Sequence, residues 1–113
     1  MIDPETLVNK NIFDIQSLVS EFSFRLRAIP SMQIHVKIWR AAESYEGDHF
    51  TCTCSHFVKT PTQASVYAPG SSFTSSAEEA ARKAIRDMIT SVVGAIGEGR
   101  TPSESWLEGN DDF

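Results

Sequence analysis

The chain has 113 residues, 41% of them hydrophobic and 22% charged, which is typical of one globular domain and excludes a disordered chain. No apolar run approaches the roughly 20 residues that a bilayer-spanning helix needs, and the first residues lack the basic and apolar regions of a signal peptide, so we expect a cytoplasmic protein without membrane contact. The net charge of −5 is opposite in sign to that of most nucleic-acid-binding proteins, which disfavours nucleic acid as a partner.

The N-terminal residues carry a helix-start signal. Asp3 can cap a helix, Pro4 fits the first helical position and Glu5 suits the first turn. We therefore expect a helix from here to about Ser20, either continuous or broken near residues 9–11. Its buried face would consist of the apolar residues that recur at helical spacing, namely Ile12, Ile15, Leu18, Val19 and Phe22.

Residues 22–29 allow two interpretations. A heptad spacing continues to Ile29 and predicts that the helix extends to Pro30, whereas the alternation of apolar and polar residues from Phe22 to Ala28 predicts a half-buried strand. The strand is favoured, because a helix would place Phe24 on its solvent-facing side.

A series of short strands is expected next. Ile34, Val36 and Ile38 alternate with polar or amphipathic residues and predict a strand after a turn at Pro30-Ser31. The strand from His49 to Lys59 would place Phe50, Cys52, Cys54, His56 and Val58 on one face. The other expected elements are a hairpin loop at Glu43–Asp48 and a short strand at Ala64–Ala68.

The segment Phe73–Gly97 carries the firmest helix signal. Ser76 and Glu79 form a capping box, in which each side chain accepts a hydrogen bond from a backbone N–H at the helix start. Gly97 supplies a stop. The predicted apolar stripe consists of Ala77, Ala81, Ala84, Ile85, Met88, Ile89, Val92, Val93 and Ile96.

This element order predicts an α+β fold of two layers. We expect a single domain over residues 1–97, in which an N-terminal helix and a long C-terminal helix cover one face of an antiparallel meander of three or four strands. The other face of the sheet would stay partly open. Residues 98–113 hold five acidic residues against one arginine and are expected to form an acidic tail.

Cys52, Cys54 and His56 raise the question of a zinc site, with His35 as a possible fourth ligand. The usual spacing of two to four residues between cysteines is absent, and successive residues on one strand face lie too far apart to share one ion. Reduced cysteines in the core, with no metal and no cofactor, are the preferred interpretation.

His56 is followed by a polar run that could form a small-ligand or partner site at the end of the sheet. The candidate residues are His56, Thr60, Thr62, Gln63 and Tyr67. The competing and preferred interpretation is a turn stiffened by Pro61. No motif combines a nucleophile, a base and a stabilising group, so the sequence predicts no catalytic residue.

Exposed aromatic side chains are the positive indication of an interaction surface. Trp106 and Phe113 stand in an otherwise hydrophilic segment. Docking on the domain itself, with Trp106 covering the edge of the core, is the preferred interpretation, and docking on a partner or in a dimer exchange is the alternative. Trp39 and Phe57 are predicted on the sheet. These residues favour a non-enzymatic interaction module that associates with itself or with another protein, through the open sheet face or the tail.

Two resemblances add to this interpretation. The order of elements and the segment SSAEEAARKAI resemble double-stranded RNA-binding domains in topology, but Glu78 and Glu79 stand where those domains place phosphate-binding lysines. The segments SHFVKTPTQASVY, EEAARKAI and PSESWL resemble small uncharacterised proteins of cyanobacteria. That resemblance implies a soluble cytoplasmic protein and transfers no catalytic residue.

Overall fold

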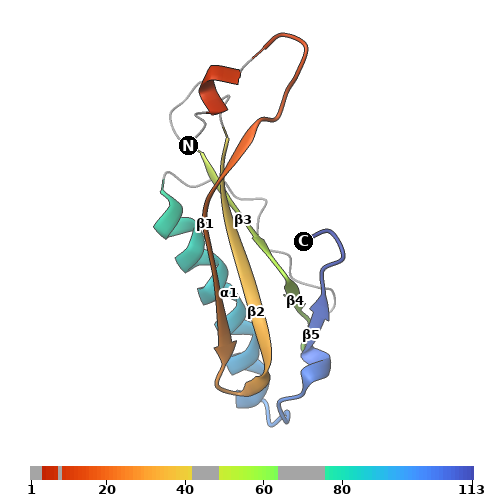
Figure 1. Cartoon of the computed structure of the whole chain (residues 1–113). Helices are drawn as coiled ribbons and strands as arrows, with labels where there is room; N and C mark the ends of the chain where they lie inside the picture. The colour runs from red at the N-terminus through yellow and green to blue at the C-terminus, as the bar shows by residue number, and fades with distance from the viewer. Residues whose placement is uncertain (1–3, 8, 42–48, 64–75) are drawn as a thin grey trace.

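The structure is a computed structural model that describes residues 4–7, 9–41, 49–63 and 76–113. The molecule is elongated, with extents of 53 × 24 × 23 Å (Figure 1). Its elements are, in chain order, η1 (Pro4–Leu7), β1 (Gln16–Leu26), β2 (Ile29–Ala41), β3 (Phe50–Cys54), β4 (His56–Val58), α1 (Ala77–Gly97), η2 (Glu104–Trp106) and β5 (Leu107–Gly109).

The α+β class and the antiparallel meander are confirmed. Strands β1, β2 and β3 form one antiparallel sheet in that order, and β4 pairs with β5 in a second, two-stranded sheet. Helix α1 lies along one face of the larger sheet (Figure 1). The core lies between the helix and this face, where Ile34, Val36 and Ile38 of β2 are almost fully buried, as their alternation predicted.

The predicted N-terminal helix is wrong. Residues 4–7 form only a short 3-10 helix, and the chain then turns at Asn9, whose side chain accepts a hydrogen bond from the backbone N–H of Asn11. Asp14 has a φ of 58°, a left-handed conformation that no α-helix contains. From Gln16 onward the chain pairs with β2, so inter-strand hydrogen bonds replace the expected helical ones.

The favoured strand interpretation of residues 22–29 is confirmed in the main. Strand β1 extends to Leu26, and Phe22 and Phe24 are half-buried against the core. The chain reverses at Arg27 and Ala28, so the turn precedes the expected position, and Pro30 and Ser31 already belong to β2. Proline is tolerated there because it stands near the start of the strand.

The single strand expected from His49 to Lys59 is divided at Ser55. Ser55 is bonded to β2 on one side, where its N–H donates to the carbonyl of His35 at 2.8 Å. Its own carbonyl accepts from the N–H of Asn110 at 2.8 Å. The strand therefore leaves the large sheet here, and β4 pairs with β5 instead, with Val58 opposite Leu107.

Helix α1 begins at the predicted cap, where the N–H of Glu79 donates to Oγ of Ser76 at 3.0 Å. Its buried stripe shares Ala84, Met88 and Val92 with the predicted one and adds Ala80 and Ala95, which were not predicted. The buried residues are Ala80, Ala84, Met88, Val92 and Ala95. Ile89, Val93 and Ile96 were expected in the core but are 44%, 59% and 41% exposed, because the three-stranded sheet does not reach this side of the helix.

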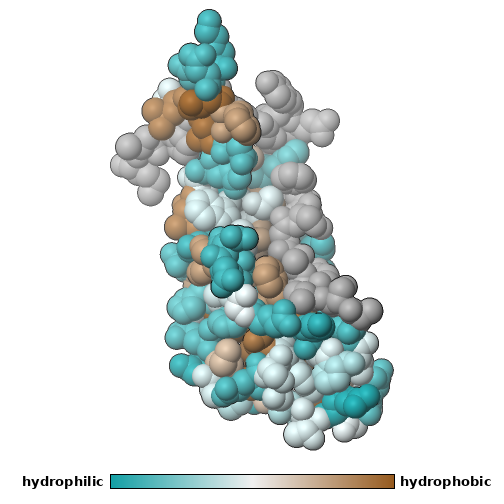
Figure 2. Space-filling view, turned by 90° about the vertical axis from the view of Figure 1, so that its right-hand side faces the viewer, coloured by the Kyte–Doolittle hydropathy of each residue, from teal (hydrophilic) through white to brown (hydrophobic). Residues whose placement is uncertain are grey.

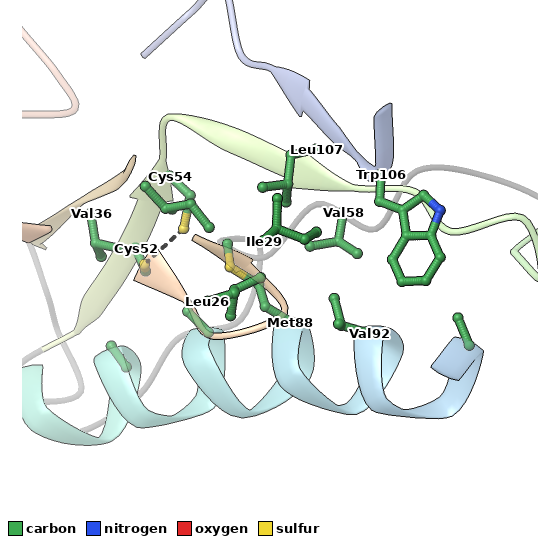
Figure 3. Packing of buried hydrophobic residues seen from close by; sticks show 14 of the residues in the cluster. Leu26, Ile29, Val36, Cys52, Cys54, Val58, Met88, Val92, Trp106 and Leu107 are labelled. Atoms are coloured by element: carbon green, nitrogen blue, oxygen red, sulfur yellow. Dashed lines mark hydrogen bonds between the residues drawn. The ribbon is translucent and has the colours of Figure 1, made fainter. Parts of the chain in front are cut away.

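Residues 98–113 do not form the expected acidic tail. They fold back as η2 and β5, and the side chains of Trp106 and Leu107 are 3% and 6% exposed. The indole of Trp106 points toward the last turns of α1, beside Val58 and Val92 (Figure 3). The backbone carbonyl of Trp106 accepts from the N–H of Lys59 at 2.7 Å. The acidic side chains instead occupy exposed positions around this apolar anchor.

Several expected features lie outside the described residues. These are the hairpin loop at Glu43–Asp48, the short strand at Ala64–Ala68 with Tyr67, and the segment Phe73–Ser75 before the helix.

The burial of Trp106 predicts that residues 98–113 contribute to stability. Replacing it in Trp106→Ala would leave a large cavity beside α1 and should lower the free energy of unfolding by about 3–5 kcal/mol in denaturant titrations. Glu108→Ala, at an exposed position two residues later in β5, is the matched control and should change it by less than about 0.5 kcal/mol. Equal effects of the two substitutions would contradict the docked arrangement.

Candidate functional site

The two cysteines lie together in the core. Both thiols are free and buried, and their Sγ atoms are 3.8 Å apart (Figure 3). The hydrogen bond to Cys52, with burial, raises the pKa of the Cys54 thiol far above its usual range. Cys54 therefore stays protonated at neutral pH, which makes it a poor nucleophile and a poor metal ligand. Among the described residues no group of three or more His, Cys, Asp or Glu side chains could hold a metal ion.

His56 lies at the strand junction rather than in a cluster of titratable groups. Its Nδ1 is 2.8 Å from Oγ of Ser55, and that hydroxyl also accepts a hydrogen bond from the N–H of His35 at 2.8 Å. The imidazole is half-buried. These bonds give His56 a structural part in fixing the point where the strand changes sheets.

The polar run after β4 forms a compact turn in which Thr60, Thr62 and Gln63 come together. Thr60 is 1% exposed, and its N–H donates to Oε1 of Gln63 at 2.7 Å. The Gln63 amide donates in turn to the carbonyl of Val58 at 3.3 Å, and the two threonine hydroxyls are 3.0 Å apart. These groups are bonded to one another, as the preferred turn interpretation requires. With Tyr67 outside the described residues, a ligand site here stays a prediction.

The four predicted surface aromatics have different environments. Trp106 is part of the core, whereas Trp39 and Phe57 are half-buried on strands. The indole N–H of Trp39 donates to Oγ1 of Thr53 at 3.0 Å, across the open face of the sheet. Phe113 lies against the same face, where Nζ of Lys37 is 4.1 Å from its ring centroid and 3.1 Å from its backbone oxygen.

An apolar hollow lined by described residues lies between β1 and α1. This groove has a volume of about 390 Å³. The end of β1, residues 24–26, and the turn residues Arg27 and Ala28 line one side. The helix contributes the other side with Ile85, Ile89, Val92, Val93 and Ile96. The exposed residues of α1 therefore form one continuous apolar wall, rather than isolated hydrophobic side chains.

Sequence reasoning placed this wall in the core. The apolar stripe of the helix was visible in the sequence, but the N-terminal helix expected on the same face of the sheet does not form. The sequence signal that could have indicated an exposed wall is the width of the stripe. The predicted stripe has more positions than the five that are buried in the structure.

A second group of exposed apolar side chains lies toward the N-terminus. Phe13 is 87% exposed, and Leu7 and Ile12 are about half exposed. Figure 2 shows hydrophobic surface gathered at the protruding end of the molecule, above a lower part that is mostly hydrophilic or neutral. Leu18 and Val19 of β1, 45% and 43% exposed, continue the apolar exposure along the strand.

Comparisons with protein-family models, curated proteins and solved structures give no match for this chain. In the part of the chain that the structure describes, no helix is both long and apolar enough to span a membrane. The candidate site therefore rests on geometry, and the groove between β1 and α1 is the feature that most resembles a binding surface.

The hydrogen bonds of Gln63 lead to a prediction about the turn. Gln63→Ala would leave the Thr60 N–H without its acceptor in a poorly hydrated place and should lower the free energy of unfolding by about 1–3 kcal/mol. Gln33→Ala is the matched control, because Gln33 is exposed and its amide donates to the hydroxyl of Ser23, which is also exposed. The control should stay within about 0.5 kcal/mol of the parent in denaturant titrations.

A contrary result would revive the ligand-site interpretation. If Gln63→Ala unfolds like the parent protein, the turn does not need this side chain for stability, and a binding role for it gains weight.

Proposed function

We propose that this chain is a non-enzymatic protein-interaction module that associates with itself. The observation that carries the proposal is the apolar groove between β1 and α1, with Ile89, Val93 and Ile96 exposed along one wall. Contiguous apolar surface of this kind, bordered by charged groups such as Arg25 and Arg27, is typical of a protein–protein contact.

The composition of the groove favours a protein over a small polar ligand. Its lining includes the two arginines on the strand side, but the helical wall is entirely aliphatic. A metabolite site needs a few converging polar groups to orient its ligand. The groove offers instead a surface on which another apolar helix face or strand edge could pack.

The other two surfaces considered from the sequence receive less support. The anchor of the C-terminal segment, Trp106, is used within the core. The open face of the sheet carries exposed polar residues such as Gln33 and His35. Apolar exposure is greater along β1 and α1, which favours association there.

A charge introduced into the groove should weaken self-association. We expect sedimentation of the parent chain to give a mass that rises with concentration, and Val93→Lys to shift that rise to at least tenfold higher concentration, because a lysine would have to be desolvated in an apolar contact. Thr90→Lys adds the same charge at an exposed site of α1 outside the groove and should sediment like the parent.

Two results would count against the proposal. A parent chain that stays monomeric up to millimolar concentration does not associate with itself. Equal effects of Val93→Lys and Thr90→Lys would show that the added charge, rather than the groove, is responsible.

A further inference from the structure

Strand β1 is one of the two edge strands of the three-stranded sheet, and no described strand pairs with its outer edge. Helix α1 covers a face of the sheet rather than this edge (Figure 1). Strand β1 is 11 residues long. A strand edge of this length presents a row of backbone donors and acceptors that a further strand could satisfy.

The direction of these backbone groups follows from β2. Both the N–H and the carbonyl of His35 bond to Ser55, on the β3 side of β2. His35 is the partner of Ser23 in the β1–β2 ladder. Residues of an antiparallel pair either exchange both hydrogen bonds or none, so the N–H and carbonyl of Ser23 point away from β2, toward the free edge. The backbone N–H and carbonyl of Glu21, two residues earlier, point in the same direction.

We infer that this edge pairs with the same edge of a second copy of the chain, antiparallel and with the two-fold axis at Ser23. The inference rests on the proposed self-association and specifies its geometry. Ser23 of each copy would exchange two backbone hydrogen bonds with Ser23 of the other. The two sheets would join into one of six strands, with both α1 helices on the same face.

Charge complementarity selects this register. With the axis at Ser23, Glu21 of each copy lies opposite Arg25 of the other, which gives two cross-strand pairs of opposite charge. Both side chains are exposed. Arg25 lies at a ladder irregularity between Phe24 and Leu26, and its Nη1 donates to the carbonyl of Pro30 at 2.9 Å. A guanidinium has five N–H donors, so the same side chain can also donate to the glutamate of the partner copy.

Shifting the axis along the strand loses this match. An axis at Glu21 places the two glutamates opposite each other, which is repulsive. An axis at Phe22 places Glu21 opposite Ser23. An axis at Phe24 moves the partner of Glu21 to Arg27, in the β1–β2 turn.

The same register also covers the apolar surface. Phe22 and Phe24 lie on the helix side of β1, with ring centroids 6.5 Å apart. Across the axis, Phe22 of each copy would lie opposite Phe24 of the other. Phe24 also lines the groove, so this contact lies at its strand side, whereas Leu18, which pairs with Trp39, lies on the open face of the sheet and stays outside it. The grooves of both copies would then lie within the interface.

Charge exchange between the two positions tests the register. Glu21→Arg alone places two arginines opposite each other, and Arg25→Glu alone places two glutamates opposite each other. Each variant should dissociate at a concentration on the order of tenfold higher or more in sedimentation equilibrium. An equimolar mixture of the two variants should associate like the parent, because the mixed pair restores opposite charges at both contacts. Rescue by mixing also excludes misfolding as the cause.

A cross-link tests the axis directly. In the proposed pair the two Ser23 Cα atoms would be about 5.5 Å apart, within reach of a disulfide, so Ser23→Cys should give a covalent dimer under mild oxidation. Ser20→Cys is the matched control, because its two copies would lie about 20 Å apart along the strands, at about 3.4 Å per residue. The native cysteines are buried and should not cross-link.

The outcomes separate the inference from the proposed function. A parent chain that never dimerises overturns both. Dimers that ignore the charge changes, fail to recover on mixing, or cross-link equally through positions 20 and 23 overturn this pairing while self-association stands.

Discussion

The fold depends on how little of helix α1 the sheet can cover. The helix is apolar over a wide stripe, but a sheet of three strands buries only its central part, at Ala84, Met88 and Val92. Of the two flanks of this stripe, the described chain covers one and leaves the other exposed. On the β3 side, η2 and β5 return and place Trp106 and Leu107 against the core. On the β1 side, the described chain supplies no cover, and the groove results.

The closure on the β3 side depends on Ser55. A straight continuation of β3 would keep pairing with β2 and would leave β5 without a partner. The bonds of Ser55 to His35 and Asn110 hold the chain at the point where it leaves one sheet for the other. The Asn110 amide adds a bond to the carbonyl of Cys54 at 2.9 Å. The backbone groups freed where the ladder is interrupted are thus paired, which partly buried polar groups require.

The sequence predicted the local elements best where pattern and environment agree. The alternation of β2 and the cap at Ser76 needed no knowledge of distant residues. The predicted N-terminal helix was wrong although its sequence signal was equally local. The conformation of these residues is decided by strand pairing with β2, through contacts about 25 residues away in sequence, such as Gln16 with Ala41. The break at Ser55 depends on Asn110, more than 50 residues later, and no local pattern contains that information.

The same limits apply to the candidate site. The polar run Thr60–Gln63 was recognisable, but hydrogen bonds within it could not be separated from bonds to a ligand without coordinates. The groove was hidden for the opposite reason. Ile89 and Val93 have the residue type and spacing of core positions, and their exposure depends on the width of the sheet, which is a property of the whole fold.

The place of Trp106 in the core has a consequence for synthesis of the chain. The β1–β2 hairpin connects neighbours in sequence and can form on a microsecond timescale once it leaves the ribosome. The contacts of Trp106 with Val58 and α1, and the hydrogen bond between Ser31 and Glu104, span up to 73 residues. Until residue 110 has emerged, the nascent chain holds an incomplete core with an apolar helix face on both flanks. Such a chain is a natural client for chaperones that bind exposed apolar segments.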